Sequence, residues 1–347
     1  MKRTTIHDIA RELNITFSTV ARALNDHPAI SAATKKAVKE TAERLNYKQN
    51  KIASSLRSGH THIVGIMVPS LHVSFFSSVV AGIEPVMNKN GYAILLYQSN
   101  ESFEQEKKGI ETLLQLRVDG IISSITTETF DTKYYEEVQN RNVPLVFFDR
   151  ALDIKDVPSV TINDYKGGFL AAEHLIKQGY KRIVHITAEE HIGIFEERMR
   201  GYLDALAFYK ISIDERLIIK GKFSLEFGRE CVRHLLKENI AFDSIFALED
   251  FTALGAIEEL KKKGIRIPED VGIIGFANEA FGEHVTPSLS TVDQHPVKMG
   301  EEAAKMLLRM LKNDEDAPIE KVKKIILEPA LMIKESSNRV EYKTPRD

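Results

Sequence analysis

Two kinds of hydrophobic pattern follow one another along this chain. In residues 1–60, apolar positions recur every three or four residues in short stretches, which is typical of small amphipathic helices. From Thr61 onward, uninterrupted apolar runs alternate with longer amphipathic stretches, as expected of buried parallel strands separated by helices. The pattern therefore predicts an all-α head followed by an α/β body.

The head is predicted to hold three helices, each preceded by a polar residue that caps its first turn. Thr5 and Asp8 form a capping box before the first helix, which ends near Asn14. Thr16 precedes the second helix and Ser31 the third. Two short helices joined by about four residues are typical of a helix-turn-helix unit. Its expected core is apolar: Ile6, Ile9, Ala10, Leu13, Val20, Ala21, Leu24, Ala33, Ala37, Val38, Ala42 and Leu45.

The second helix of such a unit enters the major groove of DNA, so its first side chains point at base edges. Here these are Phe17, Ser18 and, one turn on, Arg22. A guanidinium pairs with guanine, a hydroxyl bonds to several bases, and an aromatic ring packs on the thymine methyl. For Phe17 the alternative is a place in the core of the head. Hydroxyls at helix starts commonly bind phosphate, and here they are Thr5, Thr16, Thr19, Ser31 and Thr34.

Charge is distributed unevenly between the two parts of the chain. Residues 1–60 hold eleven Lys and Arg against five Asp and Glu, a net charge of +6. Because the whole chain carries −3, the remainder carries −9. This asymmetry favours a head that meets phosphate and a body that does not, although a solvated basic helix face would show the same excess.

The body contains two successive series of strand-like runs. Parallel strands covered by helices on both faces are expected, and two series indicate two similar lobes rather than one large sheet. Ligands of such sheets sit outside the carboxyl ends of the strands, and two facing lobes make a cleft that closes. The runs are residues 63–68, 93–97, 120–123 and 145–148, followed by 183–186, 217–219, 244–247 and 271–275.

The patterns of several other protein classes are missing. Adjacent acidic pairs such as Glu258-Glu259 diverge around a helix and make no acid/base dyad, and no nucleophile elbow occurs. His60 and His62 lack the spacing of a metal site. We therefore expect no catalytic residue, metal or cofactor, and no enzyme. The single cysteine, Cys231, the absence of a signal-like start and the absence of a bilayer-length apolar run predict a cytoplasmic protein without a membrane partner.

Four segments of the head carry a resemblance to a known family. Residues 5–10, 15–22, 45–47 and 50–53 resemble the lactose-repressor (LacI/GalR) family of bacterial transcription regulators, and the resemblance extends from about residue 4 to residue 335. The family commonly has serine where this chain has Thr16 and Ala21, and proline where it has Gln49.

The resemblance implies a domain plan. Residues 1–48 would be the helix-turn-helix domain, 49–60 a hinge helix, and 61–340 a periplasmic-binding-protein-like domain for effector binding and dimerisation. The first lobe would take about 61–161 and 292–320, and the second about 162–291 and 321–340. The hinge would fold when two copies pair over the minor groove, where Leu56 would wedge between base steps. A plain linker is the alternative. The implied DNA contacts are Thr5, Thr16, Phe17, Ser18, Thr19, Arg22, Asn25, Ser31, Thr34, Tyr47, Asn50, Ala53 and Leu56.

The resemblance, together with the strand ends, also points to the residues of the effector site. Carboxylates and arginine bond in pairs to vicinal hydroxyls, and aromatic faces cover C–H surfaces, so the cleft suits a sugar. Glu249-Asp250 stands where the family usually has Asn-Asp, and Ala277-Asn278 where it usually has Asp-Asp or Asp-Asn. The carboxylates Asp149, Asp164 and Asp250 have helix capping as their alternative role. The predicted effector-binding residues are Phe75, Phe76, Asp149, Asp164, Arg198, Phe223, Glu249, Asp250 and Asn278.

The function predicted is that of a transcriptional repressor. A homodimer would bind a pseudo-palindromic double-stranded operator, and a small-molecule effector of the carbohydrate class would control its affinity. The alternatives are a sugar-binding protein without a DNA role and a sugar-processing enzyme. The basic head argues against the first, and the missing nucleophile and base argue against the second.

Overall fold

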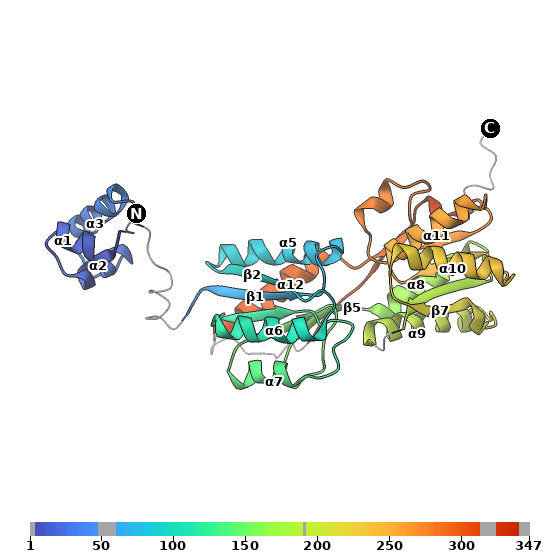
Figure 1. Cartoon of the computed structure of the whole chain (residues 1–347), viewed down its shortest axis with the longest axis horizontal. Coiled ribbons are helices and arrows are strands. Elements are labelled where there is room, and N and C mark those ends of the chain that lie inside the picture. Colours follow the sequence, from blue (N-terminus) through green and yellow to red (C-terminus); the bar gives the residue numbers. More distant parts are fainter. Residues whose placement is uncertain (1–3, 48–59, 190–191, 313–323, 340–347) are drawn as a thin grey trace. The chain divides into compact units, whose positions relative to one another are not determined.

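A computed structural model describes residues 4–47, 60–189, 192–312 and 324–339. The chain divides into two compact units, Met1–Thr61 and His62–Asp347 (Figure 1). The predicted hinge at 49–60, with Asn50, Ala53 and Leu56, therefore lies almost wholly outside the described residues. Among the described residues, no helix combines the length and apolar character that crossing a bilayer would require.

The first unit is a three-helix head with a small core, as predicted. It consists of α1 (Ile6–Glu12), α2 (Phe17–Leu24) and α3 (Ala32–Arg44). Asn14 takes a left-handed conformation with φ of 51° after the first helix, a conformation that asparagine tolerates well. The buried core residues are Ile9, Ala10, Val20, Ala23, Val38 and Ala42.

Two details of the predicted head core differ from the structure. Ala33 is exposed, whereas Ala23 is fully buried. Ala33 lies in the first turn of α3. The apolar face of α2 runs through Val20 and Ala23 at three-residue spacing, which a helix with 3.6 residues per turn permits equally well.

The first lobe of the second unit is built on a six-stranded parallel sheet. Its strands are β1 (Ile63–Val68), β2 (Ala93–Gln98), β3 (Gly120–Ser123), β4 (Leu145–Phe148), β5 (Ser159–Ile162) and β11 (Lys324–Leu327). Their order across the sheet is β11-β5-β4-β3-β1-β2. Helices α5 (Ser74–Lys89) and α12 (Pro296–Lys312) pack together on one face, and α6 (Phe103–Gln115) and α7 (Lys133–Asn140) lie on the other.

The central strand β1 is apolar throughout because both of its faces are covered. In β1, Val64 and Ile66 join the cluster that contains α5 and α12, whereas Met67 joins the cluster of α6 and α7. Side chains alternate between faces along a strand, so a central strand covered on both sides needs no polar positions. This is why the sequence shows a continuous run there.

The second lobe repeats this plan with a four-stranded parallel sheet. Its strands are β6 (Ile183–Ala188), β7 (Ile218–Gly221), β8 (Ser244–Ala247) and β9 (Gly272–Ile274), in the order β7-β6-β8-β9. Helices α8 (Asp164–Lys177) and α9 (Gly193–Phe208) pack against each other, as do α10 (Leu225–Lys237) and α11 (Asp250–Lys262). Short 3₁₀ turns lie at Glu215–Leu217, Ala280–Glu283 and Glu335–Ser337.

The connections between the lobes correct one sequence-based assignment. The chain enters α8 of the second lobe directly after β5, and it returns to α12 after β10 (Thr291–Asp293). However, β11 pairs in parallel with β5 of the first sheet. Residues 324–327 therefore belong to the first lobe, and their predicted assignment to the second lobe is wrong. The free edge of the first sheet beside β5 accepts this strand before the chain crosses. The third crossing therefore follows Leu327 instead of lying near residue 320, and β12 (Ala330–Met332) then pairs antiparallel with β10.

Candidate DNA-binding face and effector cavity

The first turn of α2 presents exposed side chains from consecutive positions. Phe17 is 52% exposed, which rules out the alternative of a core aromatic residue. Its ring lies against His7, with 5.3 Å between the ring centroids. Ser18, Arg22 and Asn25 are exposed as well, while Tyr47 is half-buried and packs against the core of the head. Phe17, Ser18 and Arg22 are thus exposed together on α2.

The hydroxyls predicted to bind phosphate also cap helices. Thr16 Oγ1 accepts a hydrogen bond from the Thr19 N–H at 3.2 Å, and the two hydroxyls lie 2.9 Å apart. Ser31 and Thr34 repeat this arrangement at the start of α3, with distances of 3.2 and 2.8 Å. The Asp8 carboxylate accepts from the Thr5 N–H at 2.8 Å, which completes the predicted capping box. Phosphate binding by these hydroxyls stays a prediction.

A cavity of about 660 Å³ in the second unit is lined by both lobes. Its polar walls follow strand ends, with Glu101 after β2, Glu128 after β3 and Asp149 after β4 in the first lobe. In the second lobe, Phe223 follows β7 and Glu249 follows β8. This is the position expected for a ligand of parallel sheets, outside the carboxyl ends of the strands.

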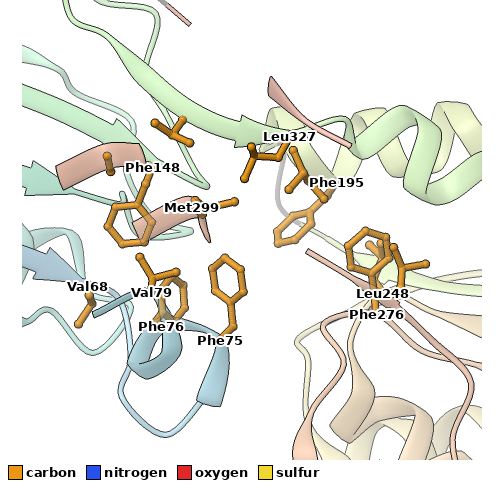
Figure 2. Close-up of a cluster of buried hydrophobic side chains, with 14 of the residues drawn as sticks. Val68, Phe75, Phe76, Val79, Phe148, Phe195, Leu248, Phe276, Met299 and Leu327 are labelled. Atoms are coloured by element: carbon orange, nitrogen blue, oxygen red, sulfur yellow. The ribbon is translucent and has the colours of Figure 1, made fainter. Parts of the chain in front are cut away.

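Apolar side chains of the two lobes meet at this cavity. Figure 2 shows Phe75 and Phe76 of the first lobe on one side and Phe195 and Phe276 of the second lobe on the other. All four are buried and belong to one hydrophobic cluster. The ring of Phe195 lies edge-on to that of Phe223, with 5.2 Å between the centroids.

Six of the nine residues predicted to bind effector line the cavity, and three do not. Those that line it are Phe75, Phe76, Asp149, Arg198, Phe223 and Glu249. Asp164, Asp250 and Asn278 are absent from the lining, and the contacts of each show what it does in the structure.

Asp164 positions Arg198 instead of facing the cavity. Arg198 Nε donates to the Asp164 carboxylate at 2.8 Å, and both side chains are almost wholly buried. Burial raises the pKa of Asp164 to about 6, and the charge of Arg198 opposes that rise. Arg198 Nη2 also donates to Gln294 at 3.2 Å, and the guanidinium lies 3.7 Å from the centroid of the Phe276 ring. The arginine is therefore held on several sides.

Asp250 holds the loop that follows β9. It is fully buried and accepts from the Glu279 N–H at 2.7 Å and from the Thr291 hydroxyl at 2.8 Å. Burial raises the pKa of Asp250 to about 7, while these two hydrogen bonds oppose the rise. Asn278 donates its backbone N–H to the same Thr291 hydroxyl at 3.1 Å, and its side chain accepts from Lys334 at 3.4 Å. Its neighbour Ala277 lines the cavity in its place.

Helix capping is the alternative role for Asp149, Asp164 and Asp250. In the structure, Asn163 and Glu249 cap the helices instead. Asn163 caps α8 by accepting from the Lys166 N–H at 3.0 Å. Glu249 caps α11, with its two carboxylate oxygens accepting from the N–H groups of Phe251 and Thr252 at 3.0 Å each. Glu249 thus lines the cavity and caps a helix, whereas Asp164 and Asp250 are first helical residues whose carboxylates bind elsewhere.

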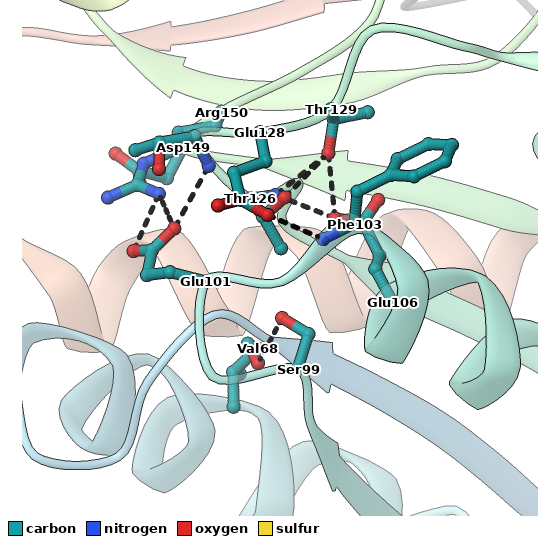
Figure 3. A network of polar contacts seen from close by, with 11 residues as sticks. Val68, Ser99, Glu101, Phe103, Glu106, Thr126, Glu128, Thr129, Asp149 and Arg150 are labelled. Carbon is teal, nitrogen blue, oxygen red and sulfur yellow. Dashed lines mark hydrogen bonds and ion pairs between the residues drawn. The ribbon is translucent and has the colours of Figure 1, made fainter. Parts of the chain in front are cut away.

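Several lining residues lie outside the predicted effector set, of which Arg150 and Glu101 are the most informative. Arg150 Nη1 donates to both Glu101 oxygens at 2.9 Å, as Figure 3 shows. The Arg150 guanidinium lies 5.6 Å from the Phe76 ring centroid and 5.8 Å from that of Phe195, so it contacts aromatic rings of both lobes. Arg150 follows the same strand as Asp149, and Glu101 follows the end of β2, so the strand-end signal applies to Glu101 as well. The other charged or polar lining residues outside that set are Ser70, His72, Asn100, Thr127, Glu128, Lys222, Ser224 and Gln294.

A buried carboxylate supports the wall that carries Thr127 and Glu128. Glu106 is fully buried and accepts from the Thr126 N–H at 2.7 Å and from the Thr129 hydroxyl at 2.8 Å (Figure 3). The hydroxyls of Tyr134 and Tyr135 donate to its other oxygen at 2.6 and 2.9 Å. Four donors satisfy a carboxylate that has no basic partner among these contacts, which fixes the turn at the cavity rim.

Several lining residues have a backbone conformation that favours glycine. Asn100, Glu101 and Asp149 have φ of 54°, 56° and 57°, and Ala277 has φ of 121°. Such conformations cost on the order of 1–3 kcal/mol for glutamate and alanine, less for asparagine and aspartate, and are frequent where a ligand is bound. The cavity therefore stores backbone strain in both lobes.

Comparison with known proteins places these two units in one family. Residues 5–50 match the family model described as bacterial regulatory proteins of the lacI family. Residues 61–326 match the model of periplasmic binding proteins and the sugar-binding domain of the LacI family. The chain belongs to the LacI family. It is accordingly a DNA-binding transcription regulator with an effector domain, and not an enzyme.

Several LacI-family relatives match this chain over most of their length. The ribose operon repressor of Halalkalibacterium halodurans is 30% identical over 89% of this chain and 90% of that protein. Catabolite control protein A of Priestia megaterium is 32% identical over 89% of this chain and 93% of that protein.

Two solved structures of transcription regulators are similar over nearly the whole chain. A complex of the transcriptional regulator CelR with cellobiose is 27% identical, with a TM-score of 0.72 over 96% of this chain and 100% of that chain. The lac repressor dimer bound to operator and an anti-inducer is 23% identical and shares the fold, with a TM-score of 0.85 over 97% and 99%. The predicted fold class, a helical head and a two-lobed α/β domain, is confirmed.

Proposed function

We propose that this LacI-family chain is a repressor whose operator affinity is controlled by a carbohydrate bound in the cavity between the lobes. The observation that carries this proposal is the cavity wall. It combines Asp149, Glu101 and two held guanidinium groups, those of Arg150 and Arg198, with aromatic rings from both lobes.

A sugar fits this combination of groups. Carboxylate oxygens accept from hydroxyls and guanidinium groups donate to them, while phenylalanine faces cover the C–H surface of the ring. The volume of about 660 Å³ falls within the range typical of small-molecule sites. Two similar structures of transcription regulators hold sugars, cellobiose in CelR and ribose in a LacI-family regulator from Enterococcus faecium.

For the head, we infer that two copies read the halves of a pseudo-palindromic operator. Phe17, Ser18 and Arg22 are exposed together on α2, as direct reading of bases in the major groove requires. A closed dimer has two-fold symmetry, which the operator would mirror. Effector binding in the cavity would change the arrangement of the lobes and thereby the distance between the two heads.

The test uses the full-length protein and needs two measurements. First, operator duplexes are selected from random DNA, and binding is followed by fluorescence anisotropy at several salt concentrations. Second, a panel of neutral sugars, uronic acids and sugar phosphates is screened for an increase in the melting temperature. We expect at least one compound to stabilise the protein and to change its operator affinity. The proposal fails if compounds bind without changing operator affinity, or if no compound of the panel binds.

A further inference from the structure

We propose that Glu279 is a positioning residue that sets the spacing between the two walls of the effector cavity by holding Ser74. This inference rests on the proposed function in one respect, namely that the arrangement of the lobes controls operator affinity. Neither residue lines the cavity, and neither was singled out by the sequence analysis.

The contact joins the two lobes at the start of a helix. Ser74 is the first residue of α5 in the first lobe, and its hydroxyl donates to Glu279 Oε2 at 2.5 Å. Glu279 follows β9 in the second lobe and is only 4% exposed. The two residues directly after Ser74 are Phe75 and Phe76, which line the cavity. Holding Ser74 therefore holds the aromatic wall of the first lobe.

The other end of the contact is anchored deep in the second lobe. The Glu279 N–H donates to Asp250 at 2.7 Å, and the second oxygen of Asp250 accepts from the Thr291 hydroxyl at 2.8 Å. Thr291 lies in β10, one of the segments that connect the lobes. A series of hydrogen bonds thus runs from a connecting strand through Asp250 and Glu279 to α5. Ala277, two residues before Glu279, lines the opposite wall of the cavity.

The second oxygen of Glu279 indicates that this contact is not optimised for stability. Among the described residues, Glu279 Oε1 is buried and has no hydrogen-bond partner. A buried carboxylate oxygen without a partner carries a desolvation penalty. A contact between lobes that carries such a penalty is easily exchanged for solvent when the lobes move apart. It therefore suits a position where two arrangements must be close in free energy.

The test is a double-mutant cycle on the full-length protein without any effector. Ser74→Ala, Glu279→Ala and the double variant are titrated with an operator duplex selected by the parent protein. If the contact biases the lobe arrangement, each single variant changes the operator Kd in the same direction by about fivefold or more. The double variant then changes it no further, because the same contact is already lost. Glu279→Gln retains an acceptor oxygen and is expected to restore most of the parental affinity.

Ser77→Ala provides the matched control. Ser77 lies one turn further along α5, is exposed, and donates its hydroxyl to the Ser74 carbonyl of the same helix at 2.9 Å. Its operator affinity should stay within about twofold of the parent, since no contact between lobes is lost. Additive effects of the two single variants would contradict the proposal. So would lowered thermal stability with unchanged operator affinity, which indicates a merely structural role.

This outcome can be separated from failure of the proposed function. If sugars shift the operator affinity of the parent but the Ser74 and Glu279 variants match the parent, the positioning role is wrong and the proposed function stands. If the variants shift operator affinity while no sugar does, the positioning role stands and the carbohydrate effector is wrong.

Discussion

The DNA-binding face and the effector cavity obtain their polar groups in opposite ways. The face takes them from one short segment of the chain, and the cavity takes them from segments far apart in the sequence. At the head, Thr16, Phe17, Ser18 and Arg22 come from one short segment, and the caps that orient it join residues three positions apart. At the cavity, Arg198 bonds to Asp164 and Gln294, which are 34 and 96 positions away, and all three are buried. Substitution of the exposed Phe17, Ser18 or Arg22 should therefore affect binding alone. Substitution at the cavity should affect both binding and stability.

The largest expected effect comes from Arg198→Ala at the cavity. Removal of the guanidinium leaves the buried Asp164 carboxylate without its ion-pair partner, and breaking such a pair costs about 3–5 kcal/mol. Urea denaturation should show this loss of unfolding free energy. The variant should also lose its response to effector, because Arg198 lines the cavity. Removing both charges with Arg198→Ala and Asp164→Ala should cost less stability than Arg198→Ala alone, and a simple sum of the two single effects would contradict this account.

A smaller effect is expected from the buried histidines of the second lobe, which should make its unfolding free energy depend on pH. Burial lowers the pKa of His185 to about 3 and that of His174 to about 4, and both lie in the second lobe. Below pH 6.5 the unfolded chain binds protons that the folded lobe does not, so stability falls as the pH falls. Between pH 7 and pH 5, His185→Gln should reduce this loss by about 2 kcal/mol.

The head provides the control for that measurement. Its described part, residues 4–47, contains the exposed histidines His7 and His27. His7→Gln lies in the other compact unit and serves as the control substitution, so the unfolding free energy of the second unit should match that of the parent at each pH. Parallel curves for the parent and His185→Gln would show that the buried histidine is not what makes the second lobe acid-sensitive.

The smallest effect on the fold is expected at the DNA-binding face. Arg22→Ala should weaken binding to the selected operator by about tenfold or more, because a bidentate contact with a base is lost. The melting temperature should stay unchanged, since the side chain is exposed. Arg11→Ala removes an equally basic side chain, 81% exposed, from outside the predicted contact set. An equal loss of affinity in both variants would show that Arg22 contributes charge alone and does not read bases.

The same contrast explains how far the sequence could be interpreted. The head was predicted nearly residue by residue, because Thr16 and Ser31 cap helices that begin one position later. For the cavity, strand ends identified Asp149 and Phe223, and the resemblance added Arg198. The same signal applies to Glu101, which is outside the predicted set, whereas Asp250 and Asn278 hold a loop and do not line the cavity.

The sequence by itself determined what depends on neighbours along the chain: helix caps, apolar periodicity, the buried strand runs and the basic head. Only the tertiary structure decided that β11 joins the first sheet, that Asp164 pairs with Arg198, and that Glu279 reaches Ser74 from 205 positions away. Local patterns follow from short-range sterics and hydrogen bonding, which a few residues specify. Pairings between distant segments follow from the order of strands in the sheets, and no single segment contains that information.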